Sequence, residues 1–389
     1  MRIIQASFIV PLNGEIIENG YLFIEEDGTL IHVTDQAPIT SDFDVEVYDG
    51  ILCPGFVNTH CHLELSHMKG LIPEASGLPE FVNQIPLLRN KSSENPLEAM
   101  AAGNNEMSQA GIVAVGDICN TSDSLNIKKD SALKYHSFVE VFGLDKNKNK
   151  ELVIKGEALV QQYESQGQDC SITPHAPYSM SPPLLEGVYA SSKGQLLSIH
   201  HQETKSENEM FLESKGDLVN LYEKRALDIS AQISFKKSSS EYSLIQYLPK
   251  NQKVLLVHNT YSEASDIDLI ENHFSNAYWC TCPKANWYIE RKLPNYDFWI
   301  DKKLKITVGT DSLASNDSLN ILEELKLIQK HYAHIPTEEL LKWASKNGAD
   351  FFGYSGLGTF TKGTKPGVLL IENVEGMMLT EQSRIKVLA

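Results

Sequence analysis

The chain has 389 residues, of which 42% are hydrophobic and 22% charged, an ordinary composition for a globular protein that can bury a large core. Its net charge of −17 argues against a nucleic-acid-binding surface, because phosphate contacts need clustered Lys and Arg. There is no apolar run long enough for a membrane span, no secretory pattern at the N-terminus and no C-x-x-C spacing among the cysteines, so we expect free thiols in a cytoplasmic protein.

The two ends of the chain predict a small β domain. Residues 1–52 read as short strands, and the apolar runs 21–24 and 29–33 flank an Asp-Gly dipeptide, which is a strong hairpin signal. Residues 362–389 contain two more strand-like runs. We therefore expect one β-sandwich domain assembled from both termini.

The middle of the chain, residues 53–361, alternates apolar runs of strand length with longer helical stretches, which is the signature of βα units. Eight such units predict an α/β fold, a (β/α)8 TIM barrel with insertions. The candidate strands are 55–58, 112–116, 138–142, 170–173, 196–199, 254–257, 277–280 and 306–309.

Polar residues recur at the C-terminal ends of these strands, where barrels of this type gather their catalytic groups. They are His60, His62, Asp117, Glu140, His175, His200, His258, Cys282 and Asp311. Packing alone does not explain such a recurrence, so we expect a catalytic site at this rim.

The first candidate strand, P-G-F-V-N-T-H-C-H, carries two histidines in alternate positions. Alternate side chains of a strand share a face, so His60 and His62 project together while Cys61 points away. Two such imidazoles can hold one metal ion through ring nitrogens. A strand that carries two histidines by chance is the alternative, but it leaves the further His and Asp residues downstream unexplained.

A coherent ligand set emerges from the strand ends: His60, His62, His200 and Asp311. Nitrogen ligands with one carboxylate suit Zn²⁺, with Fe²⁺ or Mn²⁺ as alternatives. Water bound to such an ion loses a proton near neutral pH, which supplies a hydroxide nucleophile.

Two residues close to this set are candidates for proton transfer. Glu203 follows His200 by three residues, so its carboxylate could pass a proton from the water to a substrate nitrogen; the alternative is a helix-start carboxylate favoured by the dipole. His258 could orient the hydroxide, although a lone strand-end histidine is usually structural. His201 faces away from His200, and we expect it to be structural.

Together these motifs resemble the amidohydrolase superfamily, in particular its mononuclear-metal branch of cytosine, guanine and adenosine-type deaminases and triazine hydrolases. The shared stretches are P-G-F-V-N-T-H-C-H at 54–62, T-P-H-A-P-Y-S at 173–179, H-H-Q-E-T at 200–204, V-H-N-T at 257–260, C-P-K-A-N at 282–286, G-T-D-S-L-A-S-N at 309–316 and N-G-A at 347–349. The resemblance implies one divalent metal on the four ligands named above.

The resemblance also implies roles for individual residues. The catalytic residues would be Glu203, His258 and Asp311, and the substrate-binding residues would be Glu64, His175, Glu203 and Ser315. Glu203 would protonate a ring nitrogen as hydroxide attacks the adjacent carbon, and Asp311 or Glu203 would deliver a proton to the departing ammonia. The fourth strand ends in Thr173-Pro174-His175 without the lysine of binuclear members, which favours a single metal and deamination of an aromatic ring.

Within this branch, H-C-H-L-E-L-S at 60–66 and the stretch 311–326 are most similar to the aminodeoxyfutalosine deaminases of menaquinone biosynthesis. That similarity implies deamination of a 6-aminopurine nucleoside, in a homodimer by analogy with the branch. Guanine or pterin deamination, imidazolone ring opening and triazine hydrolysis are the alternatives. A non-catalytic barrel is disfavoured because all the ligands are retained.

Two places depart from the family pattern. The usual Gly-x-x-Ala-Asp reads Gly363-Thr364-Lys365-Pro366-Gly367, without the acidic residue, and lies in the expected β domain. Trp287, Tyr288 and Arg291 replace a loop of small residues, and we expect this loop to reshape the substrate pocket.

Overall fold

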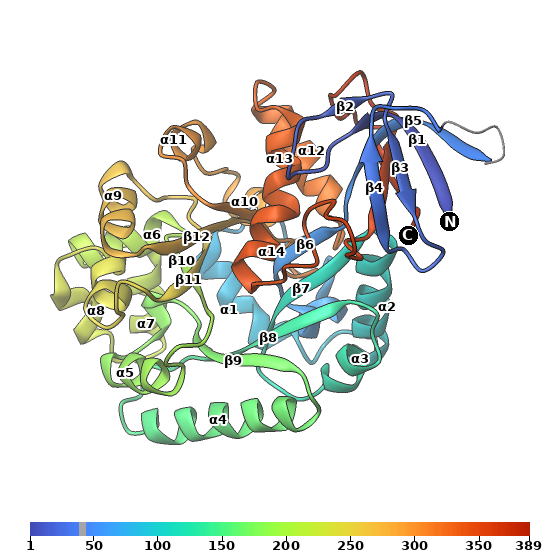
Figure 1. The fold of residues 1–389 in the computed structure, drawn as a ribbon. Coiled ribbons are helices and arrows are strands. Elements are labelled where there is room, and N and C mark those ends of the chain that lie inside the picture. Colours follow the sequence, from blue (N-terminus) through green and yellow to red (C-terminus); the bar gives the residue numbers. More distant parts are fainter. Residues whose placement is uncertain (39–43) are drawn as a thin grey trace.

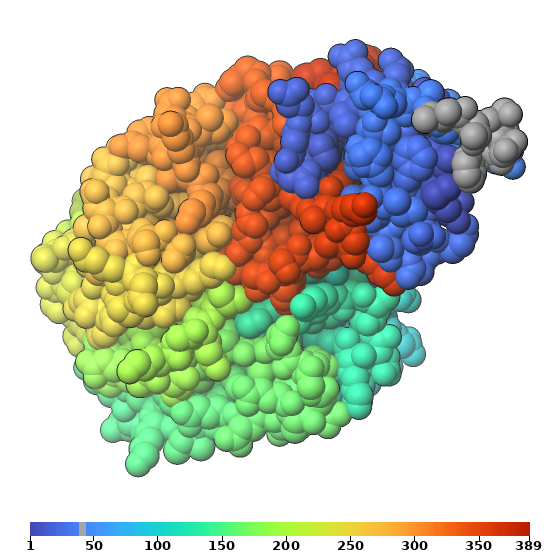
Figure 2. Space-filling model, in the orientation of Figure 1, coloured from blue at the N-terminus to red at the C-terminus, as the bar shows by residue number. Residues whose placement is uncertain are grey.

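A mixed sheet built from both ends of the chain lies beside a parallel barrel (Figure 1). The computed structural model describes residues 1–38 and 44–389. The sheet has the strand order β15-β14-β5-β1-β3-β4, with β2 paired to β1. Its strands are β1 (Arg2–Ile9), β2 (Ile17–Glu18), β3 (Tyr21–Ile24), β4 (Leu30–Thr34), β5 (Val45–Pro54), β14 (Val368–Glu372) and β15 (Arg384–Val387). Figure 2 shows the two chain ends packed in one lobe, as the sequence predicted.

The predicted hairpin joins β3 to β4 in antiparallel register. Its turn is closed by a hydrogen bond of 2.9 Å from Glu25 N to Thr29 O. Gly28 has a φ of 83°, a conformation that glycine adopts at little steric cost. The Asp-Gly signal therefore marks the turn correctly.

All eight predicted barrel strands are confirmed, and each pairs in parallel with its neighbours within two four-stranded arcs. They are β6 (Phe56–Cys61), β7 (Ile112–Cys119), β8 (Lys134–Val141), β9 (Asp169–Pro174), β10 (Leu197–His201), β11 (Lys253–His258), β12 (Asn276–Thr281) and β13 (Ile306–Val308). The predicted fold class, a TIM barrel with a terminal β domain, is therefore confirmed.

Two seams join the arcs into a closed barrel. At one seam His200 N donates to His175 O at 2.9 Å. At the other, Thr310 N and Asp311 N both donate to His60 O at 3.0 Å. Gly309 allows this approach, because a Cβ there would lie 2.8 Å from His60 Cβ. Both seams therefore run through residues of the predicted rim.

Helices surround the barrel and cover the outer face of its strands (Figure 1). They are α1 (Leu78–Leu88), α2 (Pro96–Gln109), α3 (Leu125–Lys129), α4 (Asn149–Ser165), α5 (Pro182–Ser191), α6 (Lys205–Asn208), α7 (Asp217–Lys224), α8 (Ser230–Phe235), α9 (Ala264–His273), α10 (Pro283–Glu290), α11 (Tyr296–Asp301), α12 (Ile321–His331), α13 (Thr337–Ala344) and α14 (Lys346–Phe352). Among the described residues, none of these helices is both long and apolar enough to cross a membrane. All six cysteines are free thiols, as expected.

Candidate active site

Four of the predicted residues meet at the C-terminal rim of the barrel. The Nε2 atom of His62 lies 3.1 Å from Nε2 of His60 and 3.2 Å from Nε2 of His200. The Oδ1 atom of Asp311 lies 3.6 Å from Nε2 of His60 and 3.4 Å from Nε2 of His62. Residues from β6, from β10 and from the end of β13 thus converge on one point.

The donor atoms of this rim cluster (His60, His62, His200 and Asp311) fit one small cation. Zinc–nitrogen bonds of about 2.0–2.1 Å in a tetrahedral site separate neighbouring ligand atoms by roughly 3.4 Å. His62 lies at 3.1–3.4 Å from the other three donor atoms, and His60 lies 3.6 Å from Asp311. Three imidazoles and one carboxylate are also a donor set that suits zinc.

The protonation states of the cluster favour metal binding. Burial, reinforced by the neighbouring imidazoles, lowers the pKa of His62 to about 3 and the pKa of His200 well below its ordinary value. Burial alone would raise the pKa of Asp311, but the surrounding histidines hold it below its usual range. Neutral imidazoles and an ionised carboxylate are the forms that ligate a metal.

Hydrogen bonds orient two of these side chains. The Nδ1–H of His200 donates to the carbonyl oxygen of His175 at 2.9 Å, which leaves Nε2 free as a ligand atom. Ser315 Oγ donates to Oδ2 of Asp311 at 2.7 Å, so Oδ1 faces the histidines. The backbone of Asp311 has a φ of 56°, a strained conformation that persists where the surroundings enforce it.

Glu203 and His258 lie next to the cluster. Oε2 of Glu203 is 3.6 Å from Nε2 of His258, and Oε1 accepts a hydrogen bond of 2.5 Å from the Tyr178 hydroxyl. Burial raises the pKa of Glu203 well above its ordinary value. His258 donates from Nδ1 to Oδ1 of Asn286 at 2.7 Å, and burial lowers the pKa of His258 to about 4. A carboxyl whose pKa is raised and a neutral imidazole therefore adjoin each other.

Two more of the strand-end residues face the same space. Burial lowers the pKa of His175 to about 4, and its Nδ1 lies 2.7 Å from Ser179 Oγ. Burial raises the pKa of Glu140 to about 8, and its Oε1 is 3.7 Å from Nδ1 of His200 without a hydrogen-bond partner among the described residues. Both side chains line the cavity in front of the cluster.

That cavity has a volume of about 500 Å³, within the usual range for small-molecule sites. Its inner end is formed by His62, His200 and Asp311 of the rim cluster together with Glu203 and His258, and its walls are largely apolar. The apolar wall residues include Leu65, Leu78, Phe81, Val82, Ile85, Phe142, Leu144, Tyr222, Leu227 and Ile289. Sequence reasoning did not single out this wall, because helix α1 and the segment around α7 read as ordinary amphipathic stretches.

Glu64 and Ser315, predicted to contact substrate, do not line the cavity. The carboxylate of Glu64 accepts hydrogen bonds from Asn120 N at 3.1 Å, Thr121 N at 3.1 Å and Thr121 Oγ1 at 2.9 Å. Ser315 is buried against Asp311. Both residues support neighbouring parts of the site, and their contact with substrate stays a prediction.

Asp117 and Cys282 do not join the cluster. Asp117 forms a fully buried ion pair of 2.6 Å with Lys128, and its other oxygen accepts a hydrogen bond of 2.8 Å from Leu63 N. Cys282 is buried at the start of α10. Both residues were expected at the site because they lie at strand ends. Asp117 instead points into the layer between the strands and the helices, where it pairs with Lys128.

The Trp287–Arg291 segment shapes the cavity through one lining residue and through contacts with the segment before α1. The Tyr288 hydroxyl donates to Ile72 O at 2.5 Å, and Glu290 accepts a hydrogen bond of 2.8 Å from Leu78 N. Ile289 lines the cavity itself. Helix α10 therefore holds the segment that leads into α1, which forms the apolar wall.

Comparison with known proteins places this site in a family. The sequence profile of the amidohydrolase family matches residues 51–382. A 5-methylthioadenosine/S-adenosylhomocysteine deaminase from Dictyoglomus turgidum is 26% identical over 384 residues, covering 95% of this chain and 85% of the relative. An aminodeoxyfutalosine deaminase from Nitratiruptor sp. is 28% identical over 356 residues, covering 87% of this chain and 83% of the relative.

Solved structures share the fold. The Helicobacter pylori aminofutalosine deaminase in complex with methylthio-coformycin has a TM-score of 0.82 at 24% identity, with 98% of this chain and 94% of that chain covered. An adenosine deaminase from Xanthomonas campestris with bound zinc has a TM-score of 0.69 at 17% identity, with 95% and 84% covered. At these identities the likeness supports the fold alone.

Proposed function

Because the chain belongs to the amidohydrolase family and is a hydrolase acting on carbon–nitrogen bonds, we propose that it hydrolytically deaminates the 6-amino group of a purine nucleoside. The observation that carries this proposal is that the donor atom of His62 lies within 3.1–3.4 Å of those of His60, His200 and Asp311, beside Glu203 and His258. Such a site combines a metal centre with a proton donor.

The four residues of the rim cluster would hold one divalent ion, and zinc fits their chemistry best. A bound zinc ion lowers the pKa of water to near 7 and so supplies hydroxide at neutral pH. The zinc in the Xanthomonas campestris relative agrees with this choice.

Glu203 would act as the general acid and base. Burial raises its pKa well above the ordinary value, which favours the protonated carboxyl that would donate to a ring nitrogen of the substrate. The Tyr178 hydroxyl fixes Oε1, which leaves Oε2 for the transfer. Negative charge would otherwise accumulate in the ring as the tetrahedral carbon forms.

His258 would orient the attacking oxygen. Because Nδ1 donates to Asn286, Nε2 carries no proton and can accept one hydrogen bond. His175, also neutral, would contact the purine ring from its position after β9 at the same rim. In this proposal Asp311 shares proton delivery to the leaving ammonia with Glu203.

The names of the relatives, which include 5-methylthioadenosine/S-adenosylhomocysteine, aminodeoxyfutalosine and adenosine deaminases, support an adenine nucleoside as the substrate. We favour aminodeoxyfutalosine, in menaquinone biosynthesis, because the sequence at 60–66 and 311–326 resembles that subfamily. The expected cytoplasmic location and homodimer stay predictions, and size-exclusion chromatography tests the latter.

An ammonia-release screen tests the proposal. The zinc-loaded protein is incubated with adenosine, 5′-methylthioadenosine, S-adenosylhomocysteine, aminodeoxyfutalosine, guanine, cytosine and a pterin. Release from the adenine nucleosides with conversion to the 6-oxo product supports the proposal. Turnover of guanine or the pterin alone, or of none of these compounds, would overturn it.

A further inference from the structure

A buried hydrogen-bond network joins the ends of the neighbouring strands β10 and β11 (Figure 1). His201, the last residue of β10, is fully buried, and its ring nitrogens contact Asn259 and Ser240 instead of the rim cluster. In the parallel register of the two strands, His201 pairs with His258. One residue therefore links the strand that supplies His200 to the strand that supplies His258.

The backbone at the end of β11 is left-handed at two successive positions. His258 has a φ of 73° and Asn259 has a φ of 52°. Histidine and asparagine enter this region more easily than most residues, but the conformation is sparsely populated and persists only where the surroundings enforce it. Contacts around His258 must therefore hold its backbone in place.

Asn259 supplies that restraint. Its backbone N–H donates to the carbonyl oxygen of His201 at 3.0 Å, and its side-chain Nδ2 donates to the carbonyl oxygen of Leu256 at 2.7 Å. Because Nδ2 is the donor, Oδ1 is an acceptor, and the Nδ1–H of His201 donates to it at 2.9 Å. Asn259 is buried, so water does not replace these hydrogen bonds.

Ser240 fixes the tautomer of His201. Because Nδ1 of His201 carries the proton, Nε2 accepts a hydrogen bond of 2.8 Å from the Ser240 hydroxyl, which is itself buried. Both ring nitrogens are therefore engaged, and the imidazole cannot rotate without the loss of two buried hydrogen bonds. His201 is thus a rigid support for the side chain of Asn259.

We propose that His201 is a positioning residue, which through Asn259 holds the left-handed backbone of His258 and so aims the His258 imidazole at the reacting oxygen. Nε2 of His258 lies 3.6 Å from Oε2 of Glu203, and its Nδ1 is anchored on Asn286. The inference rests on the proposed function, in which His258 orients that oxygen. A displacement of about 1 Å at such a group can lower turnover by roughly 10²-fold.

Two substitutions at one position separate positioning from packing. The amide nitrogen of asparagine can stand where Nδ1 of histidine stands, and the amide nitrogen of glutamine where Nε2 stands. His201→Asn therefore keeps the donor to Asn259, whereas His201→Gln loses it although glutamine is closer to histidine in size. On the best substrate of the ammonia-release screen, His201→Gln should lower kcat by roughly 10- to 100-fold with KM nearly unchanged and zinc still bound. His201→Asn should retain most of the wild-type kcat.

A second readout does not depend on the substrate. Crystal structures of the variants should show the φ of His258 displaced from 73° in His201→Gln and kept in His201→Asn. If His201→Gln does not fold, Asn259→Gly gives the same test and the same loss of kcat, because glycine permits the left-handed backbone without fixing it. His273→Gln, at a partly buried histidine of α9 that contacts the carbonyl oxygen of Leu248, is the control and should keep the wild-type kcat.

The outcomes separate this inference from the proposed function. Equal loss of kcat in His201→Gln and His201→Asn overturns the inference, because packing alone would then explain both. An unmoved His258 in the crystal structure of His201→Gln, or of Asn259→Gly in its place, also overturns it. If the wild type releases ammonia from none of the compounds, the proposed function fails, and the crystal structures still decide whether His201 holds the backbone of His258.

Discussion

Two regions of this barrel bury ionisable side chains. In one region the buried charges are paired with each other, and in the other the buried carboxyl groups have no cation beside them. Outside the strands, Lys128 and Asp117 form an ion pair whose remaining bonds go to Ser137 Oγ at 2.9 Å and Leu63 N at 2.8 Å. Burial alone would lower the pKa of Lys128, but Asp117 raises it well above its ordinary value. Inside the rim, Glu140 and Glu203 are buried without a cation, and their pKa values rise.

The contrast separates structural from chemical use of buried charge. Each charge of the pair outside the strands is compensated by the other, so neither is left for a ligand. The rim groups keep unpaired lone pairs and neutral imidazoles, which is costly for stability but necessary for binding and proton transfer. Variants in the first region should therefore affect stability, and variants in the second should affect turnover.

The largest effect should follow loss of a ligand. His62→Ala removes the central nitrogen of the rim cluster, so we expect turnover at background level and less than one equivalent of zinc by mass spectrometry of metals. Treatment of the wild type with a chelator should give the same loss, reversible by zinc. His331→Ala, on the outer helix α12, serves as the control. Full turnover in His62→Ala would show that activity does not depend on a metal held by the rim cluster.

Glu203→Gln should leave zinc bound and lower kcat by about 10²- to 10⁴-fold, because the amide cannot transfer a proton. Steady-state ammonia release and metal content are measured together. Glu209→Gln, which breaks a surface pair with Lys205, is the matched control. Retained activity in Glu203→Gln would refute its role as the acid.

Lys128→Met should destabilise the protein by roughly 3–5 kcal/mol, because it leaves the buried carboxylate of Asp117 without its cation. Urea unfolding at neutral pH measures this loss. Asp117→Asn/Lys128→Met should recover much of it, since Asn still accepts from Leu63 N. A double variant less stable than Lys128→Met would show that the pair acts differently from a structural ion pair.

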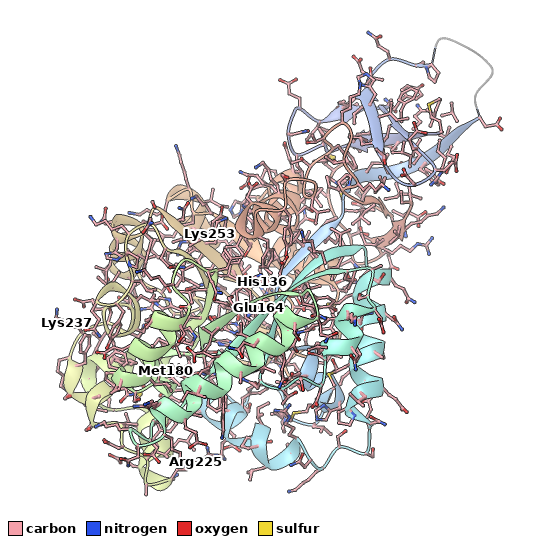
Figure 3. The ribbon with its side chains drawn as sticks, turned by 60° about the horizontal axis from the view of Figure 1, so that its bottom comes forward. His136, Glu164, Met180, Arg225, Lys237 and Lys253 are labelled. Atoms are coloured by element: carbon pink, nitrogen blue, oxygen red, sulfur yellow. The ribbon has the colours of Figure 1, made fainter. Side chains whose placement is uncertain are left out.

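A smaller effect concerns His136, a buried histidine of β8 outside the rim cluster (Figure 3). Burial lowers its pKa to about 3, and Ser171 Oγ lies 2.9 Å from Nε2. Between pH 7 and 5 the unfolded chain gains a proton here that the folded chain does not. The free energy of unfolding should therefore fall by about 2 kcal/mol on acidification.

His136→Gln should remove that part of the pH dependence, as measured by urea unfolding at pH 5, 6 and 7. His32→Gln, on the exposed hairpin strand β4, is the control. An unchanged pH profile in His136→Gln would mean that this imidazole has the same pKa in the folded protein as in the unfolded chain.

The sequence predicted the barrel and the residues that meet in the rim cluster for one physical reason. Parallel strands buried on both faces appear as apolar runs, and their C-terminal ends share one rim. The predicted strand boundaries were wrong where polar residues interrupt the apolar run. Strand β8 begins at Lys134, four residues before the predicted start at 138. Its first residues, including His136, look unlike a buried strand.

The sequence could not predict side-chain contacts that depend on tertiary packing. Lys128 and Lys129 are adjacent in the sequence, yet only the first is buried and paired with Asp117. Tyr178 stood within a motif, T-P-H-A-P-Y-S, but its contact with Glu203 depends on how β9 and β10 sit side by side. Helix α3 has five residues, which is too short for its apolar pattern to show that Lys128 faces the barrel.

The seam between β13 and β6 has a consequence for biosynthesis. The backbone oxygen of His60 accepts hydrogen bonds from Thr310 N and Asp311 N, and these same segments supply His60 and Asp311 to the rim cluster. The first and last residues of the cluster are therefore separated by most of the polypeptide. A nascent chain still on the ribosome cannot assemble the rim cluster until translation has passed Asp311.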